Sequence, residues 1–445
     1  MTAERVKLSK NGRKKVHITT LGCSKNVYDS EILMGQLQAN QVPLSDSPED
    51  ADVIIINTCG FITPAKQESI QAILEATELK EQNKDMQVIV CGCLSARYQK
   101  DLSREIPQVD AYFGTEDYQG ILKYLNLPLK NNVHLYEDRL VSTKPHYAYL
   151  KISEGCNHKC AFCAIPLMRG RHRSRSMEDI VKEARILSLQ GVKELILIAQ
   201  DTTFYGLDLY RSQKIIDLLL QLQKIESIEW IRLHYAYPTT FQDDLITLIA
   251  ESPKIVHYVD LPLQHITDHM LKIMKRGGTA RRIKQILNNL RERIPDIAIR
   301  TTFIVGHPGE TEKDFEELKN HISEFRFNRL GAFIYSPEEN TAASALKPPA
   351  KEIAERRYQE LLEIQQKISL QNNENLVGKV VKVLVDEYDP ENQSAVGRTY
   401  ADSPEIDNEV IIENISQIIN TGKFYDILIN AAAEYELFGE IVEDQ

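Results

Sequence analysis

The chain has 445 residues, of which 42% are hydrophobic, enough for about two to four domains with their own cores. Its 53 basic and 64 acidic side chains give a net charge of −11. No run of eighteen apolar residues occurs, and the basic stretch 1–15 lacks the apolar core of a secretory signal, so we expect neither a membrane span nor secretion. Seven cysteines then indicate metal or redox chemistry in a reducing compartment, and the cytoplasm is the expected location.

Residues 14–125 alternate short apolar runs with amphipathic patterns and form the first expected domain. The expected strands are 16–21, 53–57 and 88–91, and the expected helices are 27–39, 64–82 and 94–105. The second run is almost entirely aliphatic, which is typical of a strand buried on both faces. This βαβα order predicts an α/β fold with a doubly wound parallel sheet.

Three cysteines follow these three strands. Cys23 comes after the first, Cys59 after the second and Cys93 after the third. Because the carboxyl ends of parallel strands share one edge of a sheet, the three thiols are expected to gather there and could hold an iron–sulfur cluster. The alternative is that each is a small buried residue at a strand end. Cys91, inside the third strand, is interpreted as packing, although its nearness to Cys93 leaves the choice of ligand open.

Residues 131–146 interrupt the pattern and are interpreted as a linker. A second domain, 142–371, is expected to hold strands at 147–152, 194–199, 230–234, 257–261, 297–305 and 329–335, with a closing helix at 351–373. Helices lie between the strands, notably at 176–190, 213–224 and 312–325. Six such units predict an open (β/α)6 barrel whose site lies at the carboxyl ends of its strands.

The stretch Cys156-Asn-His-Lys-Cys160-Ala-Phe-Cys163 follows the first of these strands. Three thiolates on one loop can hold three irons of a [4Fe–4S] cube and leave the fourth iron without a protein ligand. The alternative is a zinc knuckle that uses His158 or His172 as fourth ligand. Structural zinc sites usually bring two short ligand pairs, and no second Cys/His pair lies nearby in the sequence.

Residues 375–442 change character. β-branched and aromatic runs at 380–385, 411–412, 425–429 and 435–442, separated by turn residues, predict a small antiparallel β-barrel of about five strands. From Leu376 onward the chain has fifteen acidic and four basic side chains, whereas the first 375 residues are balanced. Such a module is expected to repel a polyanion and to attract a basic protein.

With both cysteine sets, the chain resembles the methylthiotransferases, a family of two-cluster radical S-adenosylmethionine (SAM) enzymes. The resemblance spans an N-terminal cluster domain, a radical SAM barrel and a C-terminal TRAM-type barrel. It is carried by the cysteines and by the stretches 20–31, 57–62, 92–94, 165–170, 200–206, 262–265 and 303–311, which include Leu21-Gly22-Cys23-Ser24-Lys25-Asn26 and Gln200-Asp201-Thr202-Thr203.

The resemblance implies two [4Fe–4S] clusters with SAM as co-substrate. Cys156, Cys160 and Cys163 would hold the radical-generating cluster. Cys23, Cys59 and Cys93 would hold an auxiliary cluster that carries the transferred sulfur. The implied reaction attaches a methylthio group to the β-carbon of an aspartate in small-subunit ribosomal protein twelve. That C–H has no acidity within reach of an ordinary side chain, so no catalytic acid–base pair is expected.

The resemblance also implies SAM contacts. Gln200 and Asp201, after the second barrel strand, would meet the methionine end, and Gln264 the ribose. Ile304 and Gly306 match only part of the adenine-side pattern Gly-x-Ile-x-Gly-x-x-Glu. Thr302 occupies the position of the first glycine, and Glu310 lies one residue beyond the position of the glutamate. Asp201 as a turn cap is the alternative, and His265 is interpreted as structural. The basic residues after the cluster loop are interpreted mainly as a solvated loop: Arg169, Arg171, Arg173 and Arg175.

The expected partners are a basic ribosomal protein bound by the acidic barrel, an electron donor protein and a sulfur donor, without direct nucleic acid. Two alternatives remain open at this stage. One is a tRNA adenosine methylthiotransferase of MiaB type, because TRAM-type barrels often bind RNA. The other is a zinc-bound adaptor that uses its acidic barrel for docking.

Overall fold

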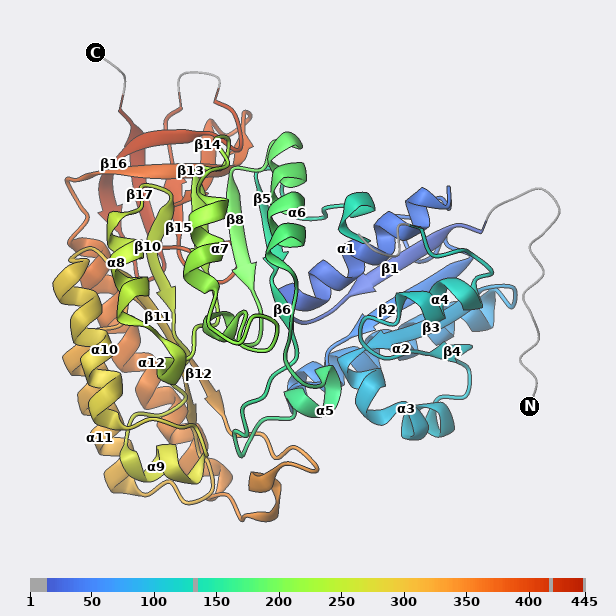
Figure 1. The fold of residues 1–445 in the computed structure, drawn as a ribbon, viewed down its shortest axis with the longest axis horizontal. Helices are drawn as coiled ribbons and strands as arrows, with labels where there is room; N and C mark the ends of the chain where they lie inside the picture. The colour runs from blue at the N-terminus through green and yellow to red at the C-terminus, as the bar shows by residue number, and fades with distance from the viewer. Residues whose placement is uncertain (1–13, 131–134, 416–418, 443–445) are drawn as a thin grey trace.

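The structure, a computed structural model, describes residues 14–130, 135–415 and 419–442. Figure 1 shows three parts: a helix-covered sheet at the N-terminus, an open half-barrel beside it, and a small β-barrel at one end of the half-barrel. Within the described residues, no helix combines the length and apolar character needed to cross a membrane.

The N-terminal sheet has four parallel strands in the order β1-β2-β3-β4, with helices on both faces. This confirms the predicted parallel sheet and adds one short strand, β4. Every residue of β2 is buried, as its aliphatic composition predicts. The elements are β1 (Val16–Thr20), α1 (Ser24–Ala39), β2 (Val53–Thr58), α2 (Thr63–Gln82), β3 (Gln87–Gly92), α3 (Cys93–Glu105), β4 (Ala111–Tyr112) and α4 (Tyr118–Tyr124).

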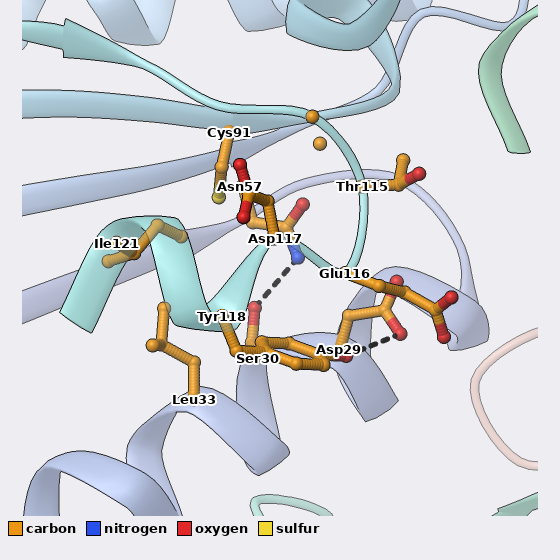
Figure 2. Close-up of a pocket in the computed structure, with 12 residues that line it drawn as sticks. Asp29, Ser30, Leu33, Asn57, Cys91, Thr115, Glu116, Asp117, Tyr118 and Ile121 are labelled. Carbon is orange, nitrogen blue, oxygen red and sulfur yellow. Dashed lines mark hydrogen bonds between the residues drawn. The ribbon is translucent and has the colours of Figure 1, made fainter. Parts of the chain in front are cut away.

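Cys91 lies inside β3, two residues before Cys93. Its side chain lines a cavity of about 10 Å³ together with Asn57 and Tyr118, next to α1 (Figure 2). A space of this size holds at most one water molecule. Burial raises the pKa of Cys91 far above that of an ordinary thiol, so this cysteine packs within the core in the way its position in the strand predicts.

The half-barrel contains six parallel strands in the order β12-β11-β10-β9-β8-β5, which confirms the six predicted βα units. A two-stranded ribbon, β6–β7, flanks the loop that carries Cys156 and was not predicted. The strands of the half-barrel and of this ribbon are β5 (Tyr147–Lys151), β6 (Ser153–Glu154), β7 (Arg173–Ser174), β8 (Glu194–Ile198), β9 (Trp230–Leu233), β10 (Ile255–Asp260), β11 (Ala298–Val305) and β12 (Arg329–Ile334).

Helices cover the outside of the half-barrel. The side chains of Ser176 and Thr311 accept backbone N–H groups at the starts of α6 and α11, which fixes where these helices begin. The helices are α5 (Ile165–Arg169), α6 (Met177–Leu189), α7 (Ile215–Leu222), α8 (Asp243–Glu251), α9 (Asp268–Ile273), α10 (Ala280–Arg293), α11 (Glu312–Phe325) and α12 (Lys351–Glu374).

The C-terminal part is a closed five-stranded barrel in the order β13-β14-β15-β17-β16. Strand number and closure agree with the prediction, but the barrel is not wholly antiparallel, because β15 and β17 pair in parallel. The strand β14, which contains Gly397 and polar residues, gave no β-branched run in the sequence. The strands are β13 (Val380–Asp389), β14 (Ser394–Arg398), β15 (Glu409–Ile412), β16 (Phe424–Ala432) and β17 (Glu436–Ile441).

The barrel is anchored at the amino ends of the half-barrel strands by buried charges. Glu194, at the start of β8, is fully buried between Arg232 of β9 and Arg398 of β14. Arg398 also contacts Asp386 of the barrel at 2.8 Å. Trp230, the single tryptophan of the chain, packs beside Phe424 of the barrel with ring centroids 4.8 Å apart. A carboxylate of the half-barrel and a guanidinium of the barrel therefore meet in this junction.

Two further barrel aspartates take part in the same junction. Asp402 pairs with Arg329 of β12, and Asp407 contacts Arg300 of β11 at 3.2 Å. Since β strands rise about 3.3 Å per residue, strands of six residues put the barrel about 20 Å from the opposite, carboxyl end of the sheet.

The segment between the first two parts is packed and does not behave as a free linker. Residues 131–134 lie outside the described part, but Leu135–Asp138 forms a 3-10 helix, and the guanidinium of Arg139 just after it is buried. Arg139 pairs with Glu31 of α1 and with Glu183 of α6, each at 2.6 Å. One side chain thereby ties the connecting segment to both parts.

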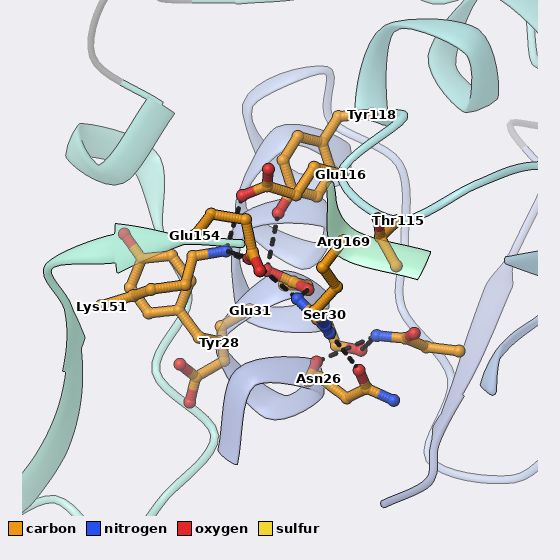
Figure 3. A network of polar contacts seen from close by, with 12 residues as sticks. Asn26, Tyr28, Ser30, Glu31, Thr115, Glu116, Tyr118, Lys151, Glu154 and Arg169 are labelled. Atoms are coloured by element: carbon orange, nitrogen blue, oxygen red, sulfur yellow. Dashed lines mark hydrogen bonds and ion pairs between the residues drawn. The ribbon is translucent and has the colours of Figure 1, made fainter. Parts of the chain in front are cut away.

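A second charge network joins the N-terminal part to the half-barrel and is seen in Figure 3. Lys151, at the end of β5, donates to Asp29 at 2.5 Å, to Glu116 at 2.7 Å and to Glu154 at 3.0 Å. Arg169 of α5 contacts the same Asp29 and Glu154, at 3.1 and 2.8 Å. Asp29 and Glu116 come from the N-terminal part, so these two cations hold the parts in one orientation.

We expect the substitution Arg398→Met to loosen the C-terminal barrel. It leaves the buried carboxylate of Asp386 without its guanidinium and removes one of two partners from Glu194, which costs about 3 kcal/mol. Denaturant unfolding followed by the fluorescence of Trp230, which lies in this junction, measures the loss. The matched control Lys379→Met, at an exposed position of the barrel, changes stability by no more than about 0.5 kcal/mol. Equal stability of the two variants would contradict the anchoring role.

Lys151→Met is expected to destabilise the docking of the N-terminal part by about 3–5 kcal/mol, because three carboxylates then share a buried space without their common ammonium. Hydrogen exchange of the α1 amides reports this docking directly. The control is Lys182→Met, whose side chain is 51% exposed and whose ion pair is a surface one. Unchanged protection of α1 in Lys151→Met would show that the network does not hold the interface.

Candidate metal centres

The first cysteine triad lies at the carboxyl ends of three adjacent strands. Cys23 caps the start of α1 after β1, Cys59 follows β2, and Cys93 is the first residue of α3 after β3. Because β1, β2 and β3 are neighbours in the sheet, the three turns lie side by side. The structure thus brings together the three cysteines that the strand pattern placed at one edge.

Glycines allow these turns to approach closely. Gly22 has a φ of +91°, and a Cβ there would lie 2.9 Å from the sulfur of Cys59. A Cβ on Gly60 would lie 2.8 Å from Cα of Leu94, the residue after Cys93. Neither contact leaves room for a side chain, so both positions require glycine.

The buried thiols of this triad interact electrostatically. Burial raises the pKa of Cys93 to about 12, with Arg169 opposing the rise and with Cys23 and Cys59 adding to it. Burial likewise raises the pKa of Cys59. Since only a thiolate is a good metal ligand, metal binding here has to displace protons, and a nearby cation helps that exchange.

The second triad lies on the loop between β6 and α5. Backbone hydrogen bonds fix this loop: Cys156 N–H donates to Gly170, and Ala161 N–H donates to Met274 at 2.7 Å. Burial raises the pKa of Cys156 to about 11 and that of Cys163 to about 12. Each pKa is raised further by the neighbouring cysteines, so the three sulfurs form one group.

Neither cysteine triad, as described, is compact enough for a single zinc ion. Zinc–sulfur bonds of 2.3 Å in a tetrahedron place sulfurs about 3.8 Å apart. Among the described residues, which include all the cysteines, no three cysteine sulfurs lie within 4.8 Å of one another. In the part of the chain that the structure describes, the one compact group of possible metal ligands is Asp29, Glu116 and Glu154, and it already surrounds the ammonium of Lys151.

Both histidines considered as a fourth zinc ligand have polar partners in the described structure. His158 Nε2 lies 2.6 Å from the carboxylate of Asp201, and its ring stacks on Tyr237 at 3.7 Å. His172 is buried and contacts Ser174. Three thiols that leave one position open fit a [4Fe–4S] cube.

One cysteine of the first triad contacts the segment that follows the second triad. Cys93 packs against Ala164, the residue after Cys163, and against Met168 of α5. Arg169 donates from Nε to the sulfur of Cys93 at 3.3 Å and is almost fully buried. A residue six positions after Cys163 thereby contacts a cysteine of the other triad.

The interpretation of the arginines after the cluster loop as a solvated basic loop is wrong for two of them. Arg169 is buried beside Cys93, and Arg175 pairs with Glu183 at 2.6 Å. Arg171 and Arg173 are exposed, as that interpretation predicts. The regular spacing of these arginines did not indicate which of them are buried or paired, because their carboxylate partners come from other parts of the chain.

Two further cationic or phenolic side chains border Cys160 and were not predicted. Arg276 Nη1 lies 3.6 Å from its sulfur, and the hydroxyl of Tyr237 lies 4.0 Å away. A guanidinium beside a thiolate favours the charged form that binds iron.

Gln200 and Asp201 both follow β8, but their surroundings differ. Gln200 donates its amide to Glu154, while its buried Oε1 has no protein partner. Asp201 is buried, and its carboxylate accepts from Thr203 and from the N–H of Phe204. Gln200 is thus left with a free acceptor in the site, and Asp201 caps its own turn.

The three residues expected at the nucleoside end lie on neighbouring strand ends. Gln264 and Ile304 are joined by a backbone hydrogen bond of 2.9 Å. The N–H of Gly306 is taken by Glu310 at 2.6 Å, and a Cβ on Gly306 would collide with Ala354 of α12. Packing against α12 accounts for this glycine, and the SAM contacts of all three residues stay predictions. His265 is buried and accepts N–H groups of the next turn, which fits a structural histidine.

Comparisons with known proteins agree with this geometry. A family model for the radical SAM superfamily matches residues 150–322, one for the uncharacterized protein family UPF0004 matches 15–114, and one for the TRAM domain matches 377–442. Among solved structures, the radical S-adenosylmethionine methyltransferase TsrM from Kitasatospora setae covers 75% of this chain, and the chain covers 77% of it, with a TM-score of 0.54. At 13% identity that likeness concerns the fold alone.

Curated relatives align over nearly the whole chain. The protein of Christiangramia forsetii is 49% identical over 96% of this chain and 94% of its own length. That of Aquifex aeolicus is 48% identical over 96% of this chain and 98% of its own. Both are named ribosomal protein uS12 methylthiotransferase RimO. The chain therefore belongs to the RimO family of ribosomal protein uS12 methylthiotransferases, within the radical SAM superfamily.

Proposed function

We propose that this enzyme holds two [4Fe–4S] clusters and attaches a methylthio group to the β-carbon of an aspartate in ribosomal protein uS12. Membership of the radical SAM superfamily implies one such cluster and SAM. The observation that carries the two-cluster proposal is the meeting of two cysteine triads at one interface, with Cys93 packed against the helix that follows Cys163. A methylthio transfer needs a sulfur source close to the carbon that is activated, and two adjacent metal groups provide that closeness.

Cys156, Cys160 and Cys163 would hold the radical-generating cluster. When bound, the cluster and SAM supply the carbon radical that removes a hydrogen atom from the substrate. The chain holds the cysteine loop in place through the hydrogen bond from Ala161 N–H to Met274. It also offers the free Oε1 of Gln200 as an acceptor for the SAM amino group. The remaining predicted contacts, Asp201, Gln264, Ile304 and Gly306, belong to the same proposal.

Cys23, Cys59 and Cys93 would hold the auxiliary cluster. The guanidinium of Arg169 donates to the sulfur of Cys93, and such a charge-assisted hydrogen bond stabilises a thiolate ligand and tunes the potential of an iron–sulfur group. Arg169 also reaches Glu154, which holds Gln200. A continuous set of hydrogen bonds therefore links the auxiliary triad to the expected SAM site.

The acidic barrel is proposed to bind the basic ribosomal protein. Its exposed side chains are mainly acidic, which favours a cationic partner over RNA and speeds its encounter. Because the barrel covers the amino ends of the half-barrel strands, a bound protein has to extend about 20 Å to reach the cysteines. The exposed acidic residues are Glu387, Asp389, Glu391, Glu405, Glu409, Glu413, Asp426 and Glu440.

An electron donor protein and a sulfur donor complete the proposed set of partners, since the chain itself supplies neither electrons nor replacement sulfur. A reducing compartment, the cytoplasm, is the proposed location, because the seven cysteines are free thiols.

Anaerobically prepared protein is expected to contain about eight irons per chain. A variant with Cys156, Cys160 and Cys163 changed to alanine, and a second with Cys23, Cys59 and Cys93 changed to alanine, are each expected to retain about four. Cys91→Ala serves as the control and keeps the full content, because Cys91 packs within the core of the N-terminal part. Iron and sulfide analysis checks this; about four irons in the wild type would reject the second cluster.

Loss of the gene is expected to remove one methylthio group from uS12 and to leave methylthiolated tRNA unchanged. Mass spectrometry of both molecules from the same cells measures the two products together. Expression of the wild-type chain restores the uS12 modification, whereas the Cys93→Ala variant does not. If methylthiolated tRNA disappeared while uS12 kept its modification, the MiaB-type alternative would replace this proposal.

A further inference from the structure

Lys25 is a buried cation without an acidic partner. Its side chain belongs to the first turn of α1, two residues after Cys23, and the residue is 7% exposed. Among the described residues, no carboxylate oxygen lies within 4.0 Å of its ammonium, and no hydrogen bond from its Nζ is present. Its one close neighbour is the ring of Tyr235, whose centroid lies 3.1 Å from Nζ.

This arrangement is an exception in the molecule. Each other buried lysine or arginine in the described ranges meets either a carboxylate or, in the case of Arg276, the sulfur of Cys160. The charge-paired ones are Arg139, Lys151, Arg169, Arg232, Arg357 and Arg398. An ammonium that is largely removed from water without an anion is costly, and one aromatic face offsets only part of that cost.

Lys25 lies at the boundary between the two cysteine triads. Tyr235 follows β9 at the carboxyl edge of the half-barrel, and its carbonyl accepts the N–H of Thr202, two residues after Gln200. Tyr237, two residues further on, reaches the sulfur of Cys160. The ammonium therefore stands next to Cys23 along the chain and contacts the strand end that borders the other triad.

Three cations lie near Tyr235, and two of them have carboxylate partners: Arg232 pairs with Glu194, and Arg300 with Asp260 and Asp407. The pKa of His234, the neighbour of Tyr235, lies well below its ordinary value, first because of burial and then because of Arg232, Arg300 and Lys25. Of these cations, only Lys25 lacks a carboxylate partner among the described residues, so a substrate carboxylate would supply the missing counter-charge.

We propose that Lys25 binds the carboxylate of the substrate aspartate and selects this residue against its amide. The inference rests on the proposed function, because the aspartate side chain has to enter between the two triads to present its β-carbon. Lys25 supplies the counter-charge there, and the ring of Tyr235 holds the ammonium in place until the substrate arrives. The role is one of specificity, and it requires no covalent step at Lys25.

A double-substitution cycle tests the pairing. Purified uS12, and uS12 with asparagine at the modified position, are titrated into the wild-type enzyme, into Lys25→Met and into Lys25→Arg. The wild type is expected to bind the aspartate form about 30-fold more tightly than the asparagine form. Lys25→Met is expected to lose this preference, because both forms then meet an uncharged side chain, and Lys25→Arg to recover most of it.

Two controls separate the possible failures. Lys84→Met, an exposed position of the same N-terminal part, keeps the wild-type preference. Iron content and SAM cleavage in the absence of uS12 remain at wild-type levels in Lys25→Met, which shows that the site is assembled. If wild-type enzyme modifies uS12 while Lys25→Met still prefers aspartate, the inference about Lys25 is wrong. If wild-type enzyme leaves uS12 unmodified, the proposed function itself fails.

Discussion

The structure depends on a buried set of charges between the N-terminal part and the half-barrel. The carboxylates of Asp29 and Glu154 are shared by two cations, Lys151 and Arg169, and all four side chains are almost inaccessible to solvent. Buried ion pairs add little net stability compared with apolar packing, but each charge is severely destabilising if its partner is misplaced. Only one relative orientation of the two parts satisfies all four groups.

That orientation is what the proposed chemistry needs. Each part contributes one cysteine triad, and neither triad could assist the other if the parts moved independently. Arg169 links the two requirements, because the guanidinium that completes the charge network also contacts the sulfur of Cys93. The same strategy recurs at the opposite end of the half-barrel, where Glu194 lies between Arg232 and Arg398 and fixes the C-terminal barrel. Some acidic side chains of this chain therefore hold its parts together, in addition to those exposed for a binding partner.

The sequence predicted those features that depend on local pattern. Strand and helix alternation located all six strands of the half-barrel, and the position of Cys23, Cys59 and Cys93 after successive strands placed them at one sheet edge. The roles of Arg169 and Lys25 could not be predicted. Arg169 has partners more than a hundred residues away in the sequence, and Lys25 is distinguished by the lack of a carboxylate partner. The parallel pairing of β15 with β17 was also missed. The direction in which two strands pair depends on how the chain connects them, and a short β-branched sequence carries no signal for it. The expected domain boundaries stay predictions.

The most direct test of the account is the location of iron in crystals of the anaerobic holoenzyme. Anomalous diffraction at the iron edge is predicted to show two separate clusters, one bound by Cys23, Cys59 and Cys93 and the other by Cys156, Cys160 and Cys163. The side chain of Arg169 is predicted to lie against the sulfur of Cys93 in that crystal. A single iron site, or zinc at either triad, would contradict the account.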